Sequence, residues 1–154
     1  MRKSVPFLVA LVFSGFINAQ TITSFDFKFN HLAVSVKDVD RSANFYKEVL
    51  NLPEITNRSK LEGVRWFSLG GEMELHLISF VTEKVTVNKA VHLAVTTPEI
   101  DAFVKRLDSF KITYSDWPGT VNKVHIRADG IKQVFFQDPD GYWIEVNSDL
   151  KRSK

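Results

Sequence analysis

The sequence VFFQDPDGYWIEV, residues 134–146, decides the fold of this chain. Residues 134–136 have the β-branched and aromatic character of a buried strand. The Asp-Pro-Asp-Gly segment at 138–141 is typical of a turn, because proline suits its second position and glycine allows a positive φ. The chain then returns as a second strand in which Glu145 has apolar neighbours. A carboxylate in such a strand either lies on a solvated face or is paired, for example with a metal ion.

An internal repeat relates the two halves of the chain. NHLAVSV at 30–36 is echoed by VHLAVTT at 91–97, so His31 corresponds to His92. In each half a helical apolar pattern follows this first strand, and strand patterns follow the helix. The sequence therefore predicts an α+β fold of two βαβββ modules.

The same repeat pairs a third histidine with the glutamate. Phe67 precedes His76 by the nine positions that also separate Phe136 from Glu145. His76 therefore corresponds to Glu145, and each module contributes one side chain from its first strand and one from its last. We expect the four side chains to converge on one point about a pseudo-twofold axis.

Both predicted helices have recognisable starts. The first is expected over residues 40–50, capped by Asp38 or Asp40. The second is expected to end near Ser109, with Thr97 as its cap and Pro98 in its first turn. The first strand is expected over residues 27–36, and another strand is expected after the second helix, over residues 112–117.

The domain boundaries follow from composition. Residues 1–19 resemble a secretory signal peptide, with an early Arg2-Lys3 pair, an apolar core and a cleavage site after Ala19. A retained N-terminal anchor is the alternative. Residues 20–26 are a polar lead-in, 27–149 one domain with modules 27–82 and 89–149, and 150–154 a basic tail.

The charge balance excludes several classes of partner. Removing Arg2 and Lys3 from the 20 basic side chains leaves 18, which equals the 18 acidic ones. No basic stripe remains for nucleic acid or an anionic membrane. The chain has no cysteine, which excludes disulfides and thiolate chemistry. Together with the signal-like residues 1–19, the absence of cysteine fits a periplasmic or secreted protein.

Five segments resemble the vicinal oxygen chelate superfamily, which includes glyoxalase I, bleomycin-resistance proteins, fosfomycin-resistance transferases and extradiol dioxygenases. They are HLAVSV at 31–36, FYKEVLNL at 45–52, ELHL at 74–77, HLAV at 92–95 and FFQDPDGYWIEV at 135–146. The resemblance implies two paired βαβββ modules that form a cupped mixed sheet around one divalent metal, which chelates adjacent oxygens of a substrate.

Carried over by position, the resemblance implies His31, His76, His92 and Glu145 as the metal ligands. Three imidazoles and a carboxylate suit zinc, nickel, manganese or iron(II). Glu145 would also be the catalytic group that carries a proton. Glyoxalase I commonly has an acid in the last strand of both modules, whereas this chain has His76 in the first. Glu74, two residues earlier on the same face, is therefore an alternative ligand.

The leading hypothesis is an exported, metal-dependent lyase or isomerase of the glyoxalase I type. One alternative is an extradiol-type dioxygenase using iron(II) on two histidines and Glu145, and another is a non-catalytic protein that binds a small molecule. Arg65 and Arg127 are candidates to hold an anionic substrate group, although an exposed strand position is the more common role of such residues. The modules can pair within one chain or exchange between two, so a homodimer is one expected assembly.

Overall fold

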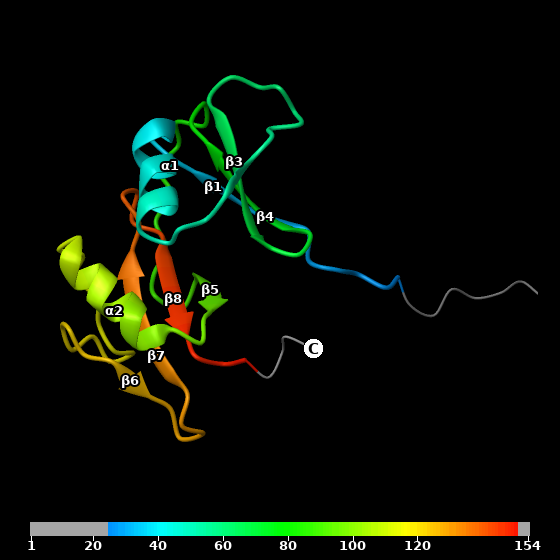
Figure 1. Cartoon of the computed structure of the whole chain (residues 1–154). Coiled ribbons are helices and arrows are strands. Elements are labelled where there is room, and N and C mark those ends of the chain that lie inside the picture. Colours follow the sequence, from blue (N-terminus) through cyan, green and yellow to red (C-terminus); the bar gives the residue numbers. More distant parts are fainter. Residues whose placement is uncertain (1–24, 151–154) are drawn as a thin grey trace, which may run out of the picture.

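The computed structural model describes residues 25–150 and contains the two predicted βαβββ modules (Figure 1). The predicted signal peptide, the start of the lead-in and residues 151–154 lie outside this range. The first module comprises β1 (His31–Ser35), α1 (Val39–Glu48), β2 (Glu54–Ile55), β3 (Val64–Gly70) and β4 (Met73–Ile78). The second comprises β5 (His92–Thr96), α2 (Ile100–Ser109), β6 (His125–Ile126), β7 (Lys132–Gln137) and β8 (Trp143–Asn147).

Each module forms its own four-stranded mixed sheet, and the two sheets have the same topology. The strand orders are β1-β4-β3-β2 and β5-β8-β7-β6. In each sheet the first and last strands of the module run parallel, while the other pairs are antiparallel. The fold prediction is confirmed, with the difference that the chain forms two sheets and not one continuous sheet. Within residues 25–150, β1 and β5 are edge strands, so each has one side without a strand partner there.

The helices differ from prediction at one end. Asp38 caps α1 as expected, because its carboxylate accepts hydrogen bonds from the backbone N–H groups of Asp40 and Arg41, both at 3.0 Å. The predicted cap at Thr97 is wrong, since α2 begins only at Ile100. The Thr97 hydroxyl instead accepts the backbone N–H of Glu99 at 3.1 Å, which closes a turn before the helix.

One predicted strand is shorter than expected, and another does not form a regular strand. The first strand begins at His31 and not at residue 27, because residues 25–30 have no neighbouring strand beyond one bond from the Glu74 N–H to the Asn30 carbonyl. The segment 112–117 makes only isolated bridges at Ser115 and is not a strand. Extended sequence therefore became a regular strand only where a partner was available.

The core lies between each sheet and its helix. On the helix-facing side, alternate strand residues such as Phe67, Leu75 and Ile144 are fully buried. Phe136, from the stretch that decides the fold, contacts Phe45 of α1 and Phe103 of α2, with ring centroids 6.4 and 5.8 Å apart. One hydrophobic cluster thus joins the two modules. Both helices lie on the same side of the molecule in Figure 1.

The turn between β7 and β8 fastens the second module to the first. The carboxylate of Asp138 accepts the hydroxyl of Tyr46 at 2.8 Å and two backbone N–H groups of its own turn. Burial raises the pKa of Asp138, and burial beside this carboxylate raises the pKa of Tyr46 well above its ordinary value. Asp140 accepts the Ser42 hydroxyl at 2.6 Å, so both acids of the turn bind α1. Gly141 has φ +94°, which explains the glycine.

Within residues 25–150, no helix is long and apolar enough to cross a membrane.

Candidate metal centre

The strand register places the predicted ligands at equivalent positions of the two modules. His31 is the first residue of β1, as His92 is of β5. In the parallel pairs, Ala33 lies opposite His76 and Ala94 lies opposite Glu145. His76, and not Glu74, is therefore the structural counterpart of Glu145. All four side chains lie on the face of their sheet that is turned away from the helix, because Leu75 and Ile144 beside them face the core.

The second module holds His92 and Glu145 in contact. Glu145 is only 8% exposed, and one of its oxygens accepts the Asn147 side-chain N–H at 2.7 Å. Its other oxygen lies 3.3 Å from His92 Nε2. His92 Nδ1 lies 2.8 Å from the Lys89 carbonyl, which can only accept a hydrogen bond. The proton of a neutral His92 is therefore on Nδ1, and its Nε2 lone pair faces the carboxylate.

Two acceptors at this separation fit a shared cation. Without a proton or a metal ion between them, the Nε2 lone pair and the carboxylate oxygen repel each other. An imidazole whose other nitrogen donates to a backbone carbonyl is also the usual arrangement of a metal-bound histidine. The donor set of His92 and Glu145 thus fits the divalent metal that the sequence predicts.

Lys89, which was not predicted from the sequence, holds His92 in place through its backbone carbonyl. Its ammonium donates hydrogen bonds to the Ser115 hydroxyl and the Asp116 carbonyl, each at 3.0 Å, and lies over the rings of Phe135 and Trp143. These contacts hold the loop that carries Trp117, whose ring packs edge-on to His92. The lysine fixes the carbonyl that orients His92, and nothing in its local sequence signals that role.

Asp116 closes the same loop. Burial raises the pKa of this carboxyl, but hydrogen bonds from Thr120, Lys123 and Gly119 outweigh the effect and lower the pKa to about 2. The carboxylate accepts the backbone N–H groups of Gly119 and Thr120 at 2.9 and 2.7 Å, and it pairs with the Lys123 ammonium at 3.1 Å. The loop beside His92 therefore depends on an ionised Asp116.

The first module stacks its two histidines. The rings of His31 and His76 are 4.3 Å apart and 15° from parallel, and Trp66 stacks on the other side of His76 at 4.0 Å. His76 Nε2 lies 2.8 Å from Glu74, which is also paired with Arg58. Hydrogen bonds from His76 and Arg58 lower the pKa of Glu74. The alternative ligand Glu74 is thus engaged with two neighbours.

A single chain assembles two pairs of ligand candidates and does not bring all four together. His31 and His76 lie on one sheet, and His92 and Glu145 lie on the other. Among residues 25–150 there is no group of three or more His, Asp or Glu side chains placed to hold a metal ion. The physical reason is the packing of the modules through their helix-bearing sides, which leaves the two histidine faces on separate sheets.

The two predicted substrate arginines have other partners in this arrangement. Arg65 lies on the helix-facing side of β3, where it pairs with Glu54 and Asp40, each at 2.7 Å. Arg127 pairs with Asp129 at 2.7 Å in the loop after β6. Neither contacts a ligand candidate within the described part of the chain. Arg58, in the loop before β3, is the arginine that lies beside the stacked histidines, where it binds Glu74. The sequence did not predict this role, and its one indication was the acid at position 74, which needs a basic partner.

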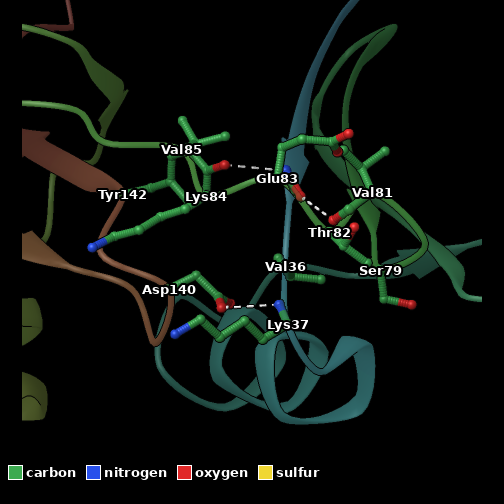
Figure 2. Close-up of a pocket in the computed structure, with 11 residues that line it drawn as sticks. Val36, Lys37, Ser79, Val81, Thr82, Glu83, Lys84, Val85, Asp140 and Tyr142 are labelled. Carbon is green, nitrogen blue, oxygen red and sulfur yellow. Dashed lines mark hydrogen bonds between the residues drawn. The ribbon is translucent and has the colours of Figure 1, made fainter.

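A separate pocket of about 330 Å³ lies at the seam between the modules. Figure 2 shows the backbone N–H of Lys37 bound to the Asp140 carboxylate at its edge, a bond of 3.0 Å. Tyr142, whose hydroxyl accepts the Ser35 backbone N–H at 3.2 Å, lines it as well. None of the predicted ligands lines this pocket, so it is a consequence of how the modules join and not the candidate centre.

The comparisons with known proteins agree with this fold. Residues 28–146 match the family model described as the Glyoxalase/Bleomycin resistance protein/Dioxygenase superfamily, and the chain belongs to that family. The resemblance stated from the sequence is thereby confirmed.

Relatives within the family carry different activities in their names. The metallothiol transferase FosB of Shouchella clausii (strain KSM-K16) is 30% identical over 123 residues, covering 77% of this chain and 78% of that protein. Glyoxylase I 4 of Arabidopsis thaliana is 29% identical over 123 residues, covering 76% and 68%. A solved glyoxalase family protein from Bacillus anthracis superposes with a TM-score of 0.66 at 25% identity, covering 82% of this chain and 98% of that one.

Proposed function

We propose that this protein is a metal-dependent lyase or isomerase of the glyoxalase I type, acting on a small molecule with two adjacent oxygens. The observation that carries the proposal is the His92–Glu145 pair, in which two acceptors 3.3 Å apart are oriented as metal ligands. The name of the Arabidopsis relative supports the glyoxalase reading. Zinc, nickel, manganese and iron(II) all suit such a donor set.

The complete centre is assembled from two copies of the chain. His31 and His76 of one copy meet His92 and Glu145 of a second, and the same contact forms twice in a symmetric dimer. Two features support this arrangement. In the described part of the chain, β1 and β5 each have one edge without a strand partner, and an apolar groove of about 450 Å³ lined by Phe29, Leu32 and Met73 runs along β5. Such edges and grooves are normally covered in a stable protein.

The chain's own residues would then perform the proton chemistry. When bound, the metal supplies a Lewis acid toward the substrate oxygens. Glu145 would take a proton from a carbon beside a carbonyl, and the Asn147 side-chain N–H, which donates to one of its oxygens, holds the carboxylate in place. The rings of Phe135 and Trp117 pack edge-on to His92, and Glu145 is only 8% exposed, so little water reaches the carboxylate.

Two measurements test this function. The purified chain is loaded with nickel, zinc or manganese, and we expect about one equivalent of metal per chain; less than about half an equivalent contradicts the proposal. The loaded protein is then incubated with dihydroxyacetone in deuterium oxide. Exchange of the carbon-bound hydrogens, followed by NMR, should be faster than with the chelator-treated protein. Tight binding of a ligand without metal and without exchange would instead indicate a binding protein.

A ring-cleaving dioxygenase is the second candidate, and one observation favours it. If His76, whose Nε2 lies against Glu74, stays outside the ligand set, then His31, His92 and Glu145 form the two-histidine, one-carboxylate set that non-haem iron(II) uses. Oxygen consumption with catechol and iron(II) would support this candidate, and its absence together with deuterium exchange would support the lyase or isomerase.

We also propose that the protein is exported, on the basis of the signal-like residues 1–19. Mass spectrometry of the protein produced with its full leader should find a new N-terminus at Gln20 if the signal is cleaved there. An intact N-terminus would contradict this part of the proposal.

A further inference from the structure

A chain of three charged and polar groups runs along the outer face of the first sheet to His76. The Arg58 Nη2 donates to both oxygens of Glu74, at 2.7 and 3.0 Å. The oxygen at 3.0 Å from Arg58 also lies 2.8 Å from His76 Nε2. Glu74 and His76 are nearly buried, with side chains 12% and 11% exposed, so both bonds are sheltered from competing water.

The neighbouring rings fix the plane of His76 but not its orientation within that plane. Trp66 lies on one side of the imidazole, 8° from parallel, and His31 lies on the other, 15° from parallel. The stacking energy changes little when the imidazole ring turns by 180° about its bond to Cβ. The hydrogen bond to Glu74 is lost on such a turn, because it requires a ring nitrogen at one particular place. Glu74 therefore selects the orientation that the stack leaves open.

The protonation of the ring follows from the same contact. An ionised carboxylate is only an acceptor, and Arg58 keeps Glu74 in that form. The His76 nitrogen that faces Glu74 must then carry the proton. The remaining lone pair of a neutral His76 is on Nδ1.

We propose that Glu74, held by Arg58, is a positioning residue that places the His76 proton on Nε2 and leaves Nδ1 as the metal-ligating nitrogen. The inference deepens the proposed function, on which its metal part rests. The protonated nitrogen then differs between the two histidines: it is Nε2 in His76 and Nδ1 in His92. His92 Nδ1 faces the Lys89 carbonyl, and its Nε2 faces Glu145. The inference also gives Glu74 a role outside the ligand set, as the carboxylate behind a ligating histidine.

Nitrogen NMR of the histidine rings tests the inference directly. The chain has four histidines, so long-range proton–nitrogen correlations can be assigned by single His→Gln variants. At a pH where the rings are neutral, the metal-free protein should show His76 protonated at Nε2 and His92 protonated at Nδ1. On addition of zinc, the Nδ1 resonance of His76 should shift while its Nε2 proton stays. A His76 ring protonated at Nδ1 in the metal-free protein would overturn the inference.

Variants of the supporting pair separate positioning from a merely structural role. Glu74→Leu should mix the two protonation forms of His76 and weaken zinc binding by about 10- to 100-fold, the usual cost of removing a group behind a metal ligand. Glu74→Gln, which keeps an acceptor oxygen, should lie between Glu74→Leu and the parent protein in both measurements. Glu72→Gln, an exposed acid in the same hairpin, is the matched control and should change neither. Unchanged His76 protonation in a folded Glu74→Leu protein would overturn the inference.

The same experiment distinguishes failure of the inference from failure of the proposed function. If the parent protein binds no zinc and His76 is still protonated at Nε2, the positioning by Glu74 is supported and the metal-dependent function is contradicted. If zinc binds tightly and Glu74→Leu affects neither zinc affinity nor ring protonation, the function stands and the positioning is contradicted.

Discussion

Mixing two inactive variants should restore part of the metal binding, because the proposed centre takes half of its ligands from each copy. One variant carries His31→Ala and His76→Ala, and the other carries His92→Ala and Glu145→Ala. In the dimers of either variant alone, every site keeps two of its four ligands. Neither variant alone should therefore bind zinc tightly.

The size of the restored signal follows from the symmetry of the dimer. When equal amounts are unfolded in urea and refolded together, about half of the dimers contain one chain of each variant. Each mixed dimer has one site with all four ligands and one site with none. The mixture should therefore bind about a quarter of a zinc ion per chain, against about one in the parent protein.

The assay is equilibrium competition for zinc with a coloured chelator, run on each variant and on the mixture. Size-exclusion chromatography with light scattering supplies the oligomeric state of each sample. A mixture that binds no more zinc than its components, although it is dimeric and folded, would refute assembly from two copies. A parent protein that is monomeric and still binds one zinc would refute it as well.

Three further changes test other parts of the account. Tyr46→Phe should lower the free energy of unfolding, measured by urea titration, by about 1–3 kcal/mol, because the buried Asp138 carboxylate loses a hydrogen-bond donor. Tyr114→Phe is the control and should cost less, because the Tyr114 hydroxyl makes no hydrogen bond within residues 25–150. Asp116 has a pKa lowered from 3.8 to about 2, so it contributes stability that is complete above pH 4 and is lost as the pH falls toward 2; Asp116→Asn should flatten the pH dependence of unfolding in that window, and an unchanged profile would contradict the loop's dependence on this carboxylate. Arg65→Ala should leave zinc affinity unchanged, since Arg65 pairs with Glu54 and Asp40 on the helix side of the sheet; a tenfold loss of zinc affinity in a folded Arg65→Ala protein would show that the two faces are coupled.

The element order and the repeat register could be predicted from the sequence because both depend on local patterns. The period-two pattern around HLAV places a histidine first in β1 and in β5, and equal spacing from Phe67 and Phe136 fixes the register of His76 and Glu145. These correspondences need no knowledge of how the modules pack. The family model covers the same residues, which is why the resemblance was visible from short motifs.

The placement of one module against the other could not be predicted in the same way. It depends on contacts between residues far apart in sequence, such as the Tyr46 hydroxyl with Asp138 and the Arg106 guanidinium with the Val49 carbonyl. These contacts join the helix-bearing sides, and they leave the two histidine faces on separate sheets. A sequence pattern identifies which face of a strand is polar, but not what that face meets.

The supporting residues of the candidate centre were missed for a related reason. Arg58 lies in a loop with no periodic pattern, and its role appears only when β4 brings Glu74 to it. Lys89 acts through its backbone carbonyl on His92, an interaction that any residue type could make. The one available signal was the acid two positions before His76, which shares its face of the strand.

The most direct test of the central claim is the anomalous diffraction of zinc-loaded crystals at the zinc absorption edge. The account predicts one strong peak within about 2.0–2.3 Å of His92 Nε2 and a Glu145 oxygen, with His31 and His76 of a second copy completing the shell. A peak bound elsewhere, or no ordered metal between His92 and Glu145, would contradict it.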